Sequence, residues 1–385
     1  MLQVGTKTDD AAAATADNAD DDNDLMAIRS PLRYIGPYPA LALSFPNLAT
    51  PAQQARGASG VTLDFVVDTA ANVNTINAAV ANELGLVAVG RAPGGVGASG
   101  PLAGNGGTTF MLGDTQLADV AAADRITFIG GLTASALPVA SPAAAGLLSL
   151  AFLFSFPGGF ELRWGNTATG QEALTPSITF FGDLAGTESV TRGLARVPAR
   201  QLESGLVVVT LNVNGVAVPA LLDTGSPVTV LNAAAAKLVG LAVPPSVAAA
   251  NAAASAKSTE DAATTTRSRN PLARFVASVQ ANVQAAQAAQ AAQAAAQSTA
   301  SSGEVLVLGG PGGARIELRR LAAAQSVAMG GVELGGDDLR CYVGDLPGLA
   351  ALGGLGAAAG PAAVLGTDIL RRRPRLVLQD GKVYL

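Results

Sequence analysis

The sequence contains one short pattern twice, and this duplication limits the possible folds more than any other feature. FVVDTAANVNTIN occupies residues 65–77, and ALLDTGSPVTVLN occupies residues 220–232. Shifting the chain by 155 positions (223 − 68) places Asp68 on Asp223 without a gap. Two copies of one unit in a single chain predict two similar lobes that form an intramolecular pseudo-dimer.

The repeat extends beyond this motif. The segments AAVANELGL and AAAAKLVGL follow the two copies, and each predicts a short Ala-rich helix that stops at a glycine. Farther along, GLLSLAFL at 146–153 matches AVLGTDIL at 363–370. The distance from the Asp to this element is 81 positions in the first copy (149 − 68) and 143 in the second (366 − 223). The difference of 62 is close to the length of the Ala/Gln-rich stretch at 246–303, which indicates an insertion into the second copy.

We therefore expect a mainly β protein of two similar lobes with few short helices. The first lobe is predicted at residues 31–190 and the second at 191–385, with the low-complexity insertion at 246–303. A chain of 385 residues is long enough for each lobe to bury its own core. Residues 1–30 are expected to be a disordered acidic N-terminus, because this segment is rich in Asp and poor in large apolar residues.

Short Val-, Ile- and Leu-rich runs alternate with Gly, Pro and Asn, as is typical of strands joined by turns. An Asn-Gly turn predicts a hairpin at 211–222, and a Gly- and Pro-rich tip predicts another at 305–318. Glycine-rich segments at 93–107 and 309–313 are candidates for mobile flaps over a cleft, with plain surface loops as the alternative. They are not phosphate-binding loops, since neither is followed by Lys-Ser or Lys-Thr at the start of a helix.

Composition excludes several kinds of chemistry. The chain has no His, so His-ligated zinc and Ser-His-Asp or Cys-His catalysis are excluded, and acid–base groups must be carboxylates, Lys or Tyr. Cys341 is the single cysteine, so no internal disulfide is possible, and we expect it to be buried. A net charge of -5 gives no basic surface for nucleic acid, and we interpret the Arg-rich run at 371–375 as a solvated turn. No metal or other cofactor is expected.

The stretch from Ile126 to Phe160 has no charged residue, which raises the alternative of a membrane span. Its most apolar part, AAAGLLSLAFLFSF at 143–156, is shorter than the roughly 20 residues that a span needs. Pro138 and Pro142 also interrupt the stretch. We therefore predict a buried core segment and no stable membrane insertion. No secretory signal is visible, so we expect an intracellular protein.

The two Asp-Thr motifs suggest a paired-carboxyl site. A single buried carboxylate without partners costs several kcal/mol. Two carboxyls that face each other across a two-fold axis cannot both ionise, so they share one proton. Such a pair can activate a water and protonate a leaving amine, which is general acid–base hydrolysis of a peptide bond. Thr69 and Thr224 can hydrogen-bond across the axis and fix the separation of Asp68 and Asp223.

The sequence resembles the retropepsin-like aspartic protease family more than pepsin. The resemblance is carried by LLDTGS at 221–226, by DTAA at 68–71, and by the apolar-apolar-Gly at 364–366. It implies catalytic Asp68 and Asp223, with Thr69, Ala70, Thr224, Gly225 and Ser226 as supporting residues. It also implies two retropepsin-like β-barrel lobes arranged as an intramolecular pseudo-dimer. The implied function is that of an aspartic endopeptidase with a peptide or protein substrate and no cofactor. Because both motifs lie on one chain, we expect a monomer.

The first copy departs from the family pattern at two positions. Ala70 replaces the Gly of Asp-Thr-Gly, and Ser149 replaces the Gly of apolar-apolar-Gly. An Ala keeps the backbone N–H, but its methyl group can crowd the two carboxyls. Two functions therefore stay open, which are an active endopeptidase and a catalytically weakened or inactive binding or structural module.

Overall fold

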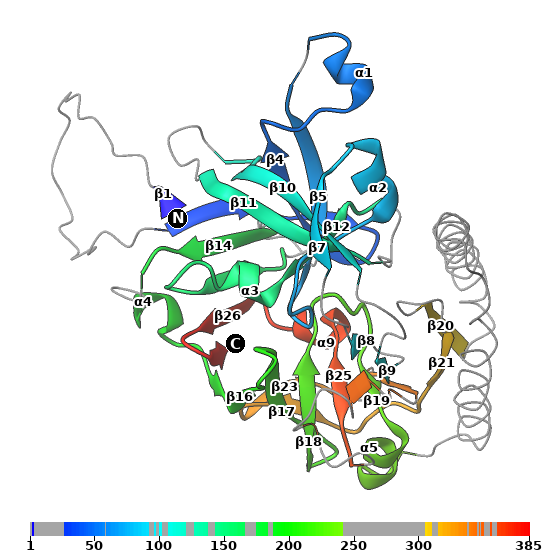
Figure 1. Ribbon diagram of the computed structural model, residues 1–385. Helices are drawn as coiled ribbons and strands as arrows, with labels where there is room; N and C mark the ends of the chain where they lie inside the picture. The colour runs from blue at the N-terminus through cyan, green and yellow to red at the C-terminus, as the bar shows by residue number, and fades with distance from the viewer. Residues whose placement is uncertain are drawn as a thin grey trace, which may run out of the picture.

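The computed structural model of the chain is mainly β, with three large sheets and, among the described residues, only short helices (Figure 1). This confirms the mainly β character and the few short helices that the sequence predicts, while the retropepsin-like pseudo-dimer is not confirmed. The structure describes residues 2–3, 27–57, 59–91, 96–97, 100–101, 107–120, 127–137, 143–165, 175–183, 188–241, 305–309, 315–336, 339–344, 346, 348–349, 355 and 360–385.

The first large sheet is built from the first half of the chain, at the top of Figure 1. Its strands run in the order β1 (Leu2–Gln3), β11 (Thr127–Ala136), β6 (Thr75–Ile76), β12 (Gly146–Ser149), β5 (Val61–Asp68), β4 (Tyr38–Phe45), β10 (Thr108–Leu117) and β7 (Ala88–Arg91), and β3 (Arg33–Ile35) pairs with β4. Its helices are α1 (Pro51–Gln54), α2 (Ala78–Glu83) and α3 (Leu150–Leu153).

The second large sheet comes from the second half, at the bottom of Figure 1. Its order is β20 (Val305–Gly309), β21 (Arg315–Arg320), β24 (Tyr342–Val343), β19 (Val230–Leu231), β25 (Ala363–Leu365), β18 (Val216–Leu222), β17 (Val207–Val213), β22 (Val327–Met329) and β23 (Val332–Gly335), and β16 (Ala199–Gln201) pairs with β17. Its helices are α5 (Ala233–Leu238) and α9 (Thr367–Leu370).

The strand pairing repeats between the two sheets. In the first, β12 runs parallel to β5 and antiparallel to β6, and β11 runs parallel to β6. In the second, β25 runs parallel to β18 and antiparallel to β19, and β24 runs parallel to β19. The internal repeat seen in the sequence is therefore a repeat of topology, and it supports two lobes of similar construction.

Local sequence signals account for the turns and helix ends. Asn214 and Gly215 take φ values of 52° and 77° between β17 and β18, as the predicted Asn-Gly hairpin requires. The predicted hairpin at 305–318 is formed by β20 and β21. The side chains of Asn77 and Asn232 cap α2 and α5, and a glycine with positive φ follows each helix.

A third sheet of six strands takes three strands from each half, and the sequence did not predict it. Its order is β15 (Arg196–Val197), β27 (Lys382–Tyr384), β26 (Arg375–Gln379), β13 (Phe160–Arg163), β14 (Ser177–Phe181) and β2 (Ala27–Pro31), with α4 (Glu188–Thr191) between β14 and β15 in the chain. The halves meet where β13 pairs antiparallel with β26. Backbone hydrogen bonds therefore join the two halves directly.

The core positions on β13 and β26 correspond to each other at this junction. Phe160 and Leu162 on β13 and Leu376 and Leu378 on β26 all face the same continuous apolar core. Matching these core positions makes Glu161 the counterpart of Val377, and the pairing register also places Glu161 opposite Val377. Position 161 is thus where the two halves face each other.

Three of the sequence predictions can be compared with the described residues. Cys341 is buried, as predicted, and so is most of the 143–156 segment. No helix in the described part of the chain is long and apolar enough to cross a membrane. The Arg-rich run is not simply a solvated turn, because Arg375 is a β26 residue whose Nε donates to Glu161. That correction arises from long-range strand pairing, which local composition does not reveal.

Other predictions fall outside the described residues. The insertion at 246–303 lies there completely, and so does most of the acidic N-terminus, although β2 begins at Ala27, before the expected boundary at residue 31. Of the two candidate flaps, the structure describes only Gly107, Gly309 and a small hairpin of β8 (Val96–Gly97) and β9 (Gly100–Pro101). Their role as flaps stays a prediction.

Glu161 is expected to be essential for the stability of the junction. Its side chain is 3% exposed and accepts hydrogen bonds from Nε of Arg163, at 2.9 Å, and of Arg375. Glu161→Gln removes the negative charge and leaves two guanidinium groups facing each other, so we expect the free energy of unfolding to fall by about 2–4 kcal/mol. Urea denaturation measures this change. Glu333→Gln, at an exposed position on β23, is the matched control and should change stability by less than about 0.5 kcal/mol.

Candidate active site

The two motif aspartates lie at equivalent ends of equivalent strands. Asp68 is the last residue of β5, and Asp223 directly follows β18. The parallel strand β12 flanks β5, so that Ser149 lies beside Asp68. The parallel strand β25 flanks β18 in the same way, and the carbonyl of its Leu365 accepts the N–H of Asp223. The local sequence causes this placement, because a buried apolar run ends where the polar residue begins.

Four hydrogen bonds between Thr69 and Thr224 and the opposite strands connect the two halves at this point. The backbone N–H of each Thr donates to the hydroxyl oxygen of the other, at 3.1 Å for the N–H of Thr69 and 3.0 Å for that of Thr224. The Thr69 hydroxyl donates to the carbonyl of Leu222 at 2.8 Å, and the Thr224 hydroxyl donates to that of Val67 at 2.6 Å. Both threonines have no exposed surface. The sequence prediction that they bridge the axis agrees with this geometry.

The surroundings of the two carboxyls differ. The N–H of Ala70 donates to Oδ1 of Asp68 at 2.8 Å. Oδ1 of Asp223, in contrast, is buried and has no hydrogen-bond partner among the described residues. Both aspartates keep part of their surface exposed, so solvent can approach the pair from one side. A buried acceptor with no partner, next to a route for solvent, is where a water or a substrate hydroxyl can bind.

The pKa values of both carboxyls are raised, and the two groups are coupled. Burial raises the pKa of Asp68 to about 6, although the N–H groups of Ala70 and Ala71 and the hydrogen bond with Asp223 lower it. Burial raises the pKa of Asp223 well above its usual range, and the negative charge of Asp68 raises it further. The hydrogen bond between the two carboxyls acts in opposite directions on the two groups. The shared proton therefore resides on Asp223, and Asp68 ionises first.

Gly225 is required by the position of Asp68. A Cβ atom on Gly225 would lie 2.6 Å from Cγ of Asp68 and 2.7 Å from its Oδ2, which is far inside contact distance. Ala70 holds the equivalent position in the first half, and its methyl group packs against the second-half apolar cluster that includes Leu221 and Val230. A side chain at position 225 would therefore collide with Asp68, whereas the side chain at position 70 has apolar neighbours to pack against.

Ser226, the remaining supporting residue, stabilises the loop after Asp223. Its hydroxyl donates to the carbonyl of Val228 at 2.8 Å, and its carbonyl accepts the N–H and the hydroxyl of Thr367. These bonds join the Asp-Thr-Gly loop to the start of α9. Ser226 is therefore a structural support of the site.

Sequence reasoning missed the residues that hold the later motif, and these differ between the halves. In the first half, Oδ1 of Asn74 accepts the N–H of Ser149 at 2.9 Å and its hydroxyl at 3.0 Å. In the second half, the hydroxyl of Thr229 accepts the N–H of Gly366 at 3.0 Å and donates to Asp368 at 2.7 Å. Positions 74 and 229 coincide under the 155-residue shift, so a polar residue at the same place in both copies was the available signal.

Ser149 is compatible with the first half because Asn74 binds its side chain. Gly366, in contrast, has no room for a side chain, since a Cβ there would lie 2.4 Å from the carbonyl oxygen of Val228. Among the described residues, no group of three or more His, Cys, Asp or Glu side chains could hold a metal ion. The coupled carboxyls of Asp68 and Asp223 are the acid–base groups of this arrangement.

Comparison with known proteins gives only structural similarities. No family model and no curated protein matches the sequence. The fold is similar to basic 7S globulin from soybean, with 12% identity over 94% of both chains and a TM-score of 0.41, and to a structure named edgp, with 12% identity over 94% of both chains and a TM-score of 0.40. It is also similar to conglutin gamma, a basic 7S globulin from lupine seeds, with 14% identity over 54% of this chain and 67% of that one and a TM-score of 0.33. The retropepsin-like family is not confirmed by these matches.

We expect Thr69→Val and Thr224→Val to destabilise the protein by similar amounts. Each substitution keeps the side-chain shape but leaves one buried N–H and one buried carbonyl without a partner, which costs about 2–4 kcal/mol. Denaturant unfolding of the two variants checks the prediction. Thr62→Val, at an exposed position of β5, is the control. A loss of less than about 1 kcal/mol for either buried variant would show that the crossed bonds are dispensable.

The raised pKa values also predict how stability depends on pH. Between the unfolded pKa near 3.8 and the folded pKa of about 6, the native state holds a proton on Asp68 that the unfolded state has lost. The free energy of unfolding should therefore decrease as pH rises through this window, by about 2–3 kcal/mol from Asp68 alone. Thermal unfolding at about pH 4 and pH 7 should show a smaller decrease for Asp68→Asn than for the wild type. Asp380→Asn is the control, because Lys382 lowers the pKa of this exposed aspartate. In this variant the free energy of unfolding should fall between the two pH values at least as much as in the wild type.

Proposed function

We propose that the chain is an aspartic endopeptidase in which Asp68 and Asp223 act as one dyad on a peptide or protein substrate. The observation that carries the proposal is the coupled carboxyl pair, held by four crossed hydrogen bonds between the two halves. A structural module without chemistry would not need two buried, coupled acidic groups whose pKa values are both raised. None of the names of the similar structures states a peptidase activity, so the enzymatic proposal depends on the dyad alone.

The difference between the two carboxyls assigns their roles. Asp68 ionises first, so its carboxylate is the general base that takes a proton from a water between the two groups. The water oxygen then attacks the carbonyl carbon of the peptide bond, while protonated Asp223 donates its proton to the carbonyl oxygen. The tetrahedral intermediate collapses when Asp68 passes its proton to the leaving nitrogen and Asp223 recovers a proton from the intermediate. Both carboxyls then return to their starting states.

The loops around the dyad would keep the two groups in position during this cycle. The crossed threonine bonds fix the separation of the strands that carry the carboxyls. The N–H of Ala70 stabilises the ionised form of Asp68, and Gly225 allows the Asp68 carboxyl to lie close to the opposite loop. The site therefore depends on contributions from both halves, which supports an active monomer.

A second function is a protease-like module that binds a ligand or serves a structural role without turnover. The observations that favour it are Ala70 and Ser149 in the first half, where the resemblance implies glycine. The methyl group of Ala70 already packs against apolar residues of the second half, which restricts adjustment of the loop beside Asp68. In this case the dyad would be retained, but its reactive geometry would not be reached.

Activity measurements on matched variants distinguish the two functions. A mixed peptide library incubated with the wild type should yield cleavage products, and Asp68→Asn and Asp223→Asn should each lose more than about 10³-fold in rate. The double variant should be scarcely worse, since the carboxyls act as a unit. The acid limb of the rate profile should lie at about pH 6, where Asp68 ionises. Asp64→Asn, outside the dyad, is the control.

The same experiment has outcomes that contradict the proposal. Wild-type activity that survives Asp68→Asn would show that the two carboxyls do not act together. A folded wild type with no cleavage at any pH between about 3 and 8 would support the second function instead.

A further inference from the structure

The six-stranded sheet carries a polar pocket that contains no residue of the dyad. Its volume is about 460 Å³, and the residues that line it include Arg29, Glu161, Arg163, Thr179, Val190 and Arg375. These residues come from β2, β13, β14 and β26 and from α4. On β13, the lining residues alternate with Phe160 and Leu162, so the pocket lies on the sheet face away from the main core.

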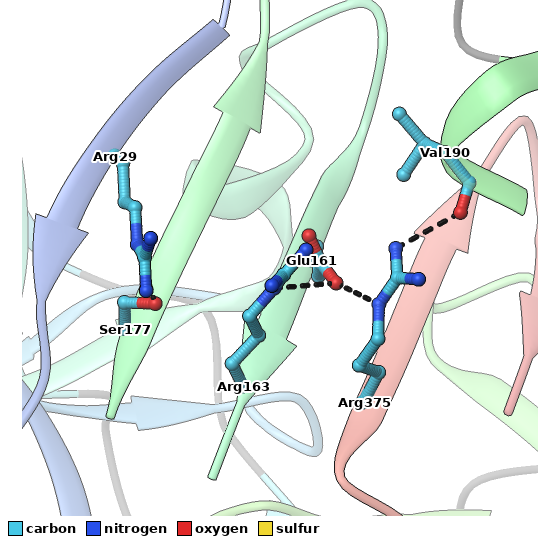
Figure 2. A network of polar contacts seen from close by, with 6 residues as sticks. All are labelled: Arg29, Glu161, Arg163, Ser177, Val190 and Arg375. Atoms are coloured by element: carbon cyan, nitrogen blue, oxygen red, sulfur yellow. Dashed lines mark hydrogen bonds and ion pairs between the residues drawn. The ribbon is translucent and has the colours of Figure 1, made fainter. Parts of the chain in front are cut away.

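Three arginines on separate strands meet at this face. Arg163 on β13 and Arg375 on β26 are direct cross-strand partners. Arg29 lies on β2, which is separated from β13 by β14, and its cross-strand partner on β14 is Thr179. Like charges directly opposite each other destabilise a sheet unless a negative charge lies between them. Figure 2 shows Glu161 between Arg163 and Arg375 in this role, with dashed lines to both guanidinium groups.

One carboxylate does not neutralise three guanidinium groups. With Glu161 ionised, the four charged lining residues have a net charge of about +2. Arg29 donates through Nε to the hydroxyl of Ser177, and Arg163 donates through Nε to Glu161. Among the described residues, no acceptor binds the terminal Nη groups of Arg29 or Arg163. As far as the described residues go, the pocket therefore has unused donors and an excess of positive charge.

We propose that this pocket is a binding site for a doubly charged oxyanion, either free phosphate or a phosphoryl group. Guanidinium forks match the oxygen geometry of phosphate and bind it through paired, charge-assisted hydrogen bonds. A charge of -2 would balance the excess at the site. The hydroxyl of Thr179 adds a neutral donor in the lining. Because Glu161 is engaged on one side of the pocket, the ligand would bind between Arg29 and Arg163.

Isothermal titration calorimetry of the full chain with inorganic phosphate tests the proposal, at an ionic strength held constant with potassium chloride. We expect saturable binding by the wild type and binding at least about tenfold weaker by Arg29→Gln, because a charge-assisted hydrogen bond contributes about 1.5 kcal/mol or more. Arg29 is exposed, so this variant should keep the fold. Arg200→Gln, at an exposed position on β16, removes the same charge elsewhere and should bind like the wild type.

Two further arms complete the experiment. Titration with phosphoserine distinguishes a phosphoryl group from free phosphate, since the natural ligand class should bind more tightly. Asp68→Asn should bind phosphate like the wild type, which separates this site from the proposed catalytic one. The proposal is overturned if the wild type shows no saturable binding, or if Arg200→Gln weakens binding as much as Arg29→Gln does.

Discussion

The crossed hydrogen bonds of Thr69 and Thr224 are the interaction on which the site depends. Two carboxyls at strand ends repel each other once both ionise, and nothing in the pair itself would hold them together. The threonines bind each strand to the carbonyl before the other aspartate, so that separation of the carboxyls requires breaking four buried bonds. Burial raises the pKa values of both carboxyls, and the enforced proximity of Asp68 raises that of Asp223 further.

The two halves reach the same backbone arrangement with different side chains. Asn74 supports Ser149 in the first half, whereas Thr229 and the half-buried Asp368 support Gly366 in the second. Burial raises the pKa of Asp368, and three hydrogen bonds from Thr229 and Ile369 oppose this effect. The residue at the start of each short helix, Ser149 or Gly366, therefore has its own polar partner. The bonds from Asn74 explain how Ser149 is accommodated at a position where the resemblance implies glycine.

Sequence reasoning succeeded where short-range chemistry decides the structure. The Asn-Gly turn at 214–215, the caps of α2 and α5, and the duplicated strand-helix units all follow from local patterns. It failed for the six-stranded sheet, because FELR on β13 and RLVLQ on β26 pair across more than 200 residues (375 − 163 = 212). A charged residue such as Glu161 also makes a short strand look exposed in the sequence, although this side chain is buried. Asn74 and Thr229 were missed because their role depends on a motif that lies far ahead in the chain.

The pairing of Glu161 with Val377 shows what fusion of the two halves makes possible. In a dimer of identical subunits, a residue on the two-fold axis must face its own copy, so a glutamate there would face a glutamate. A single chain is free of that restriction and can place a carboxylate opposite a valine, with arginines on both sides. Covalent duplication therefore allows the contact between the two halves to become asymmetric.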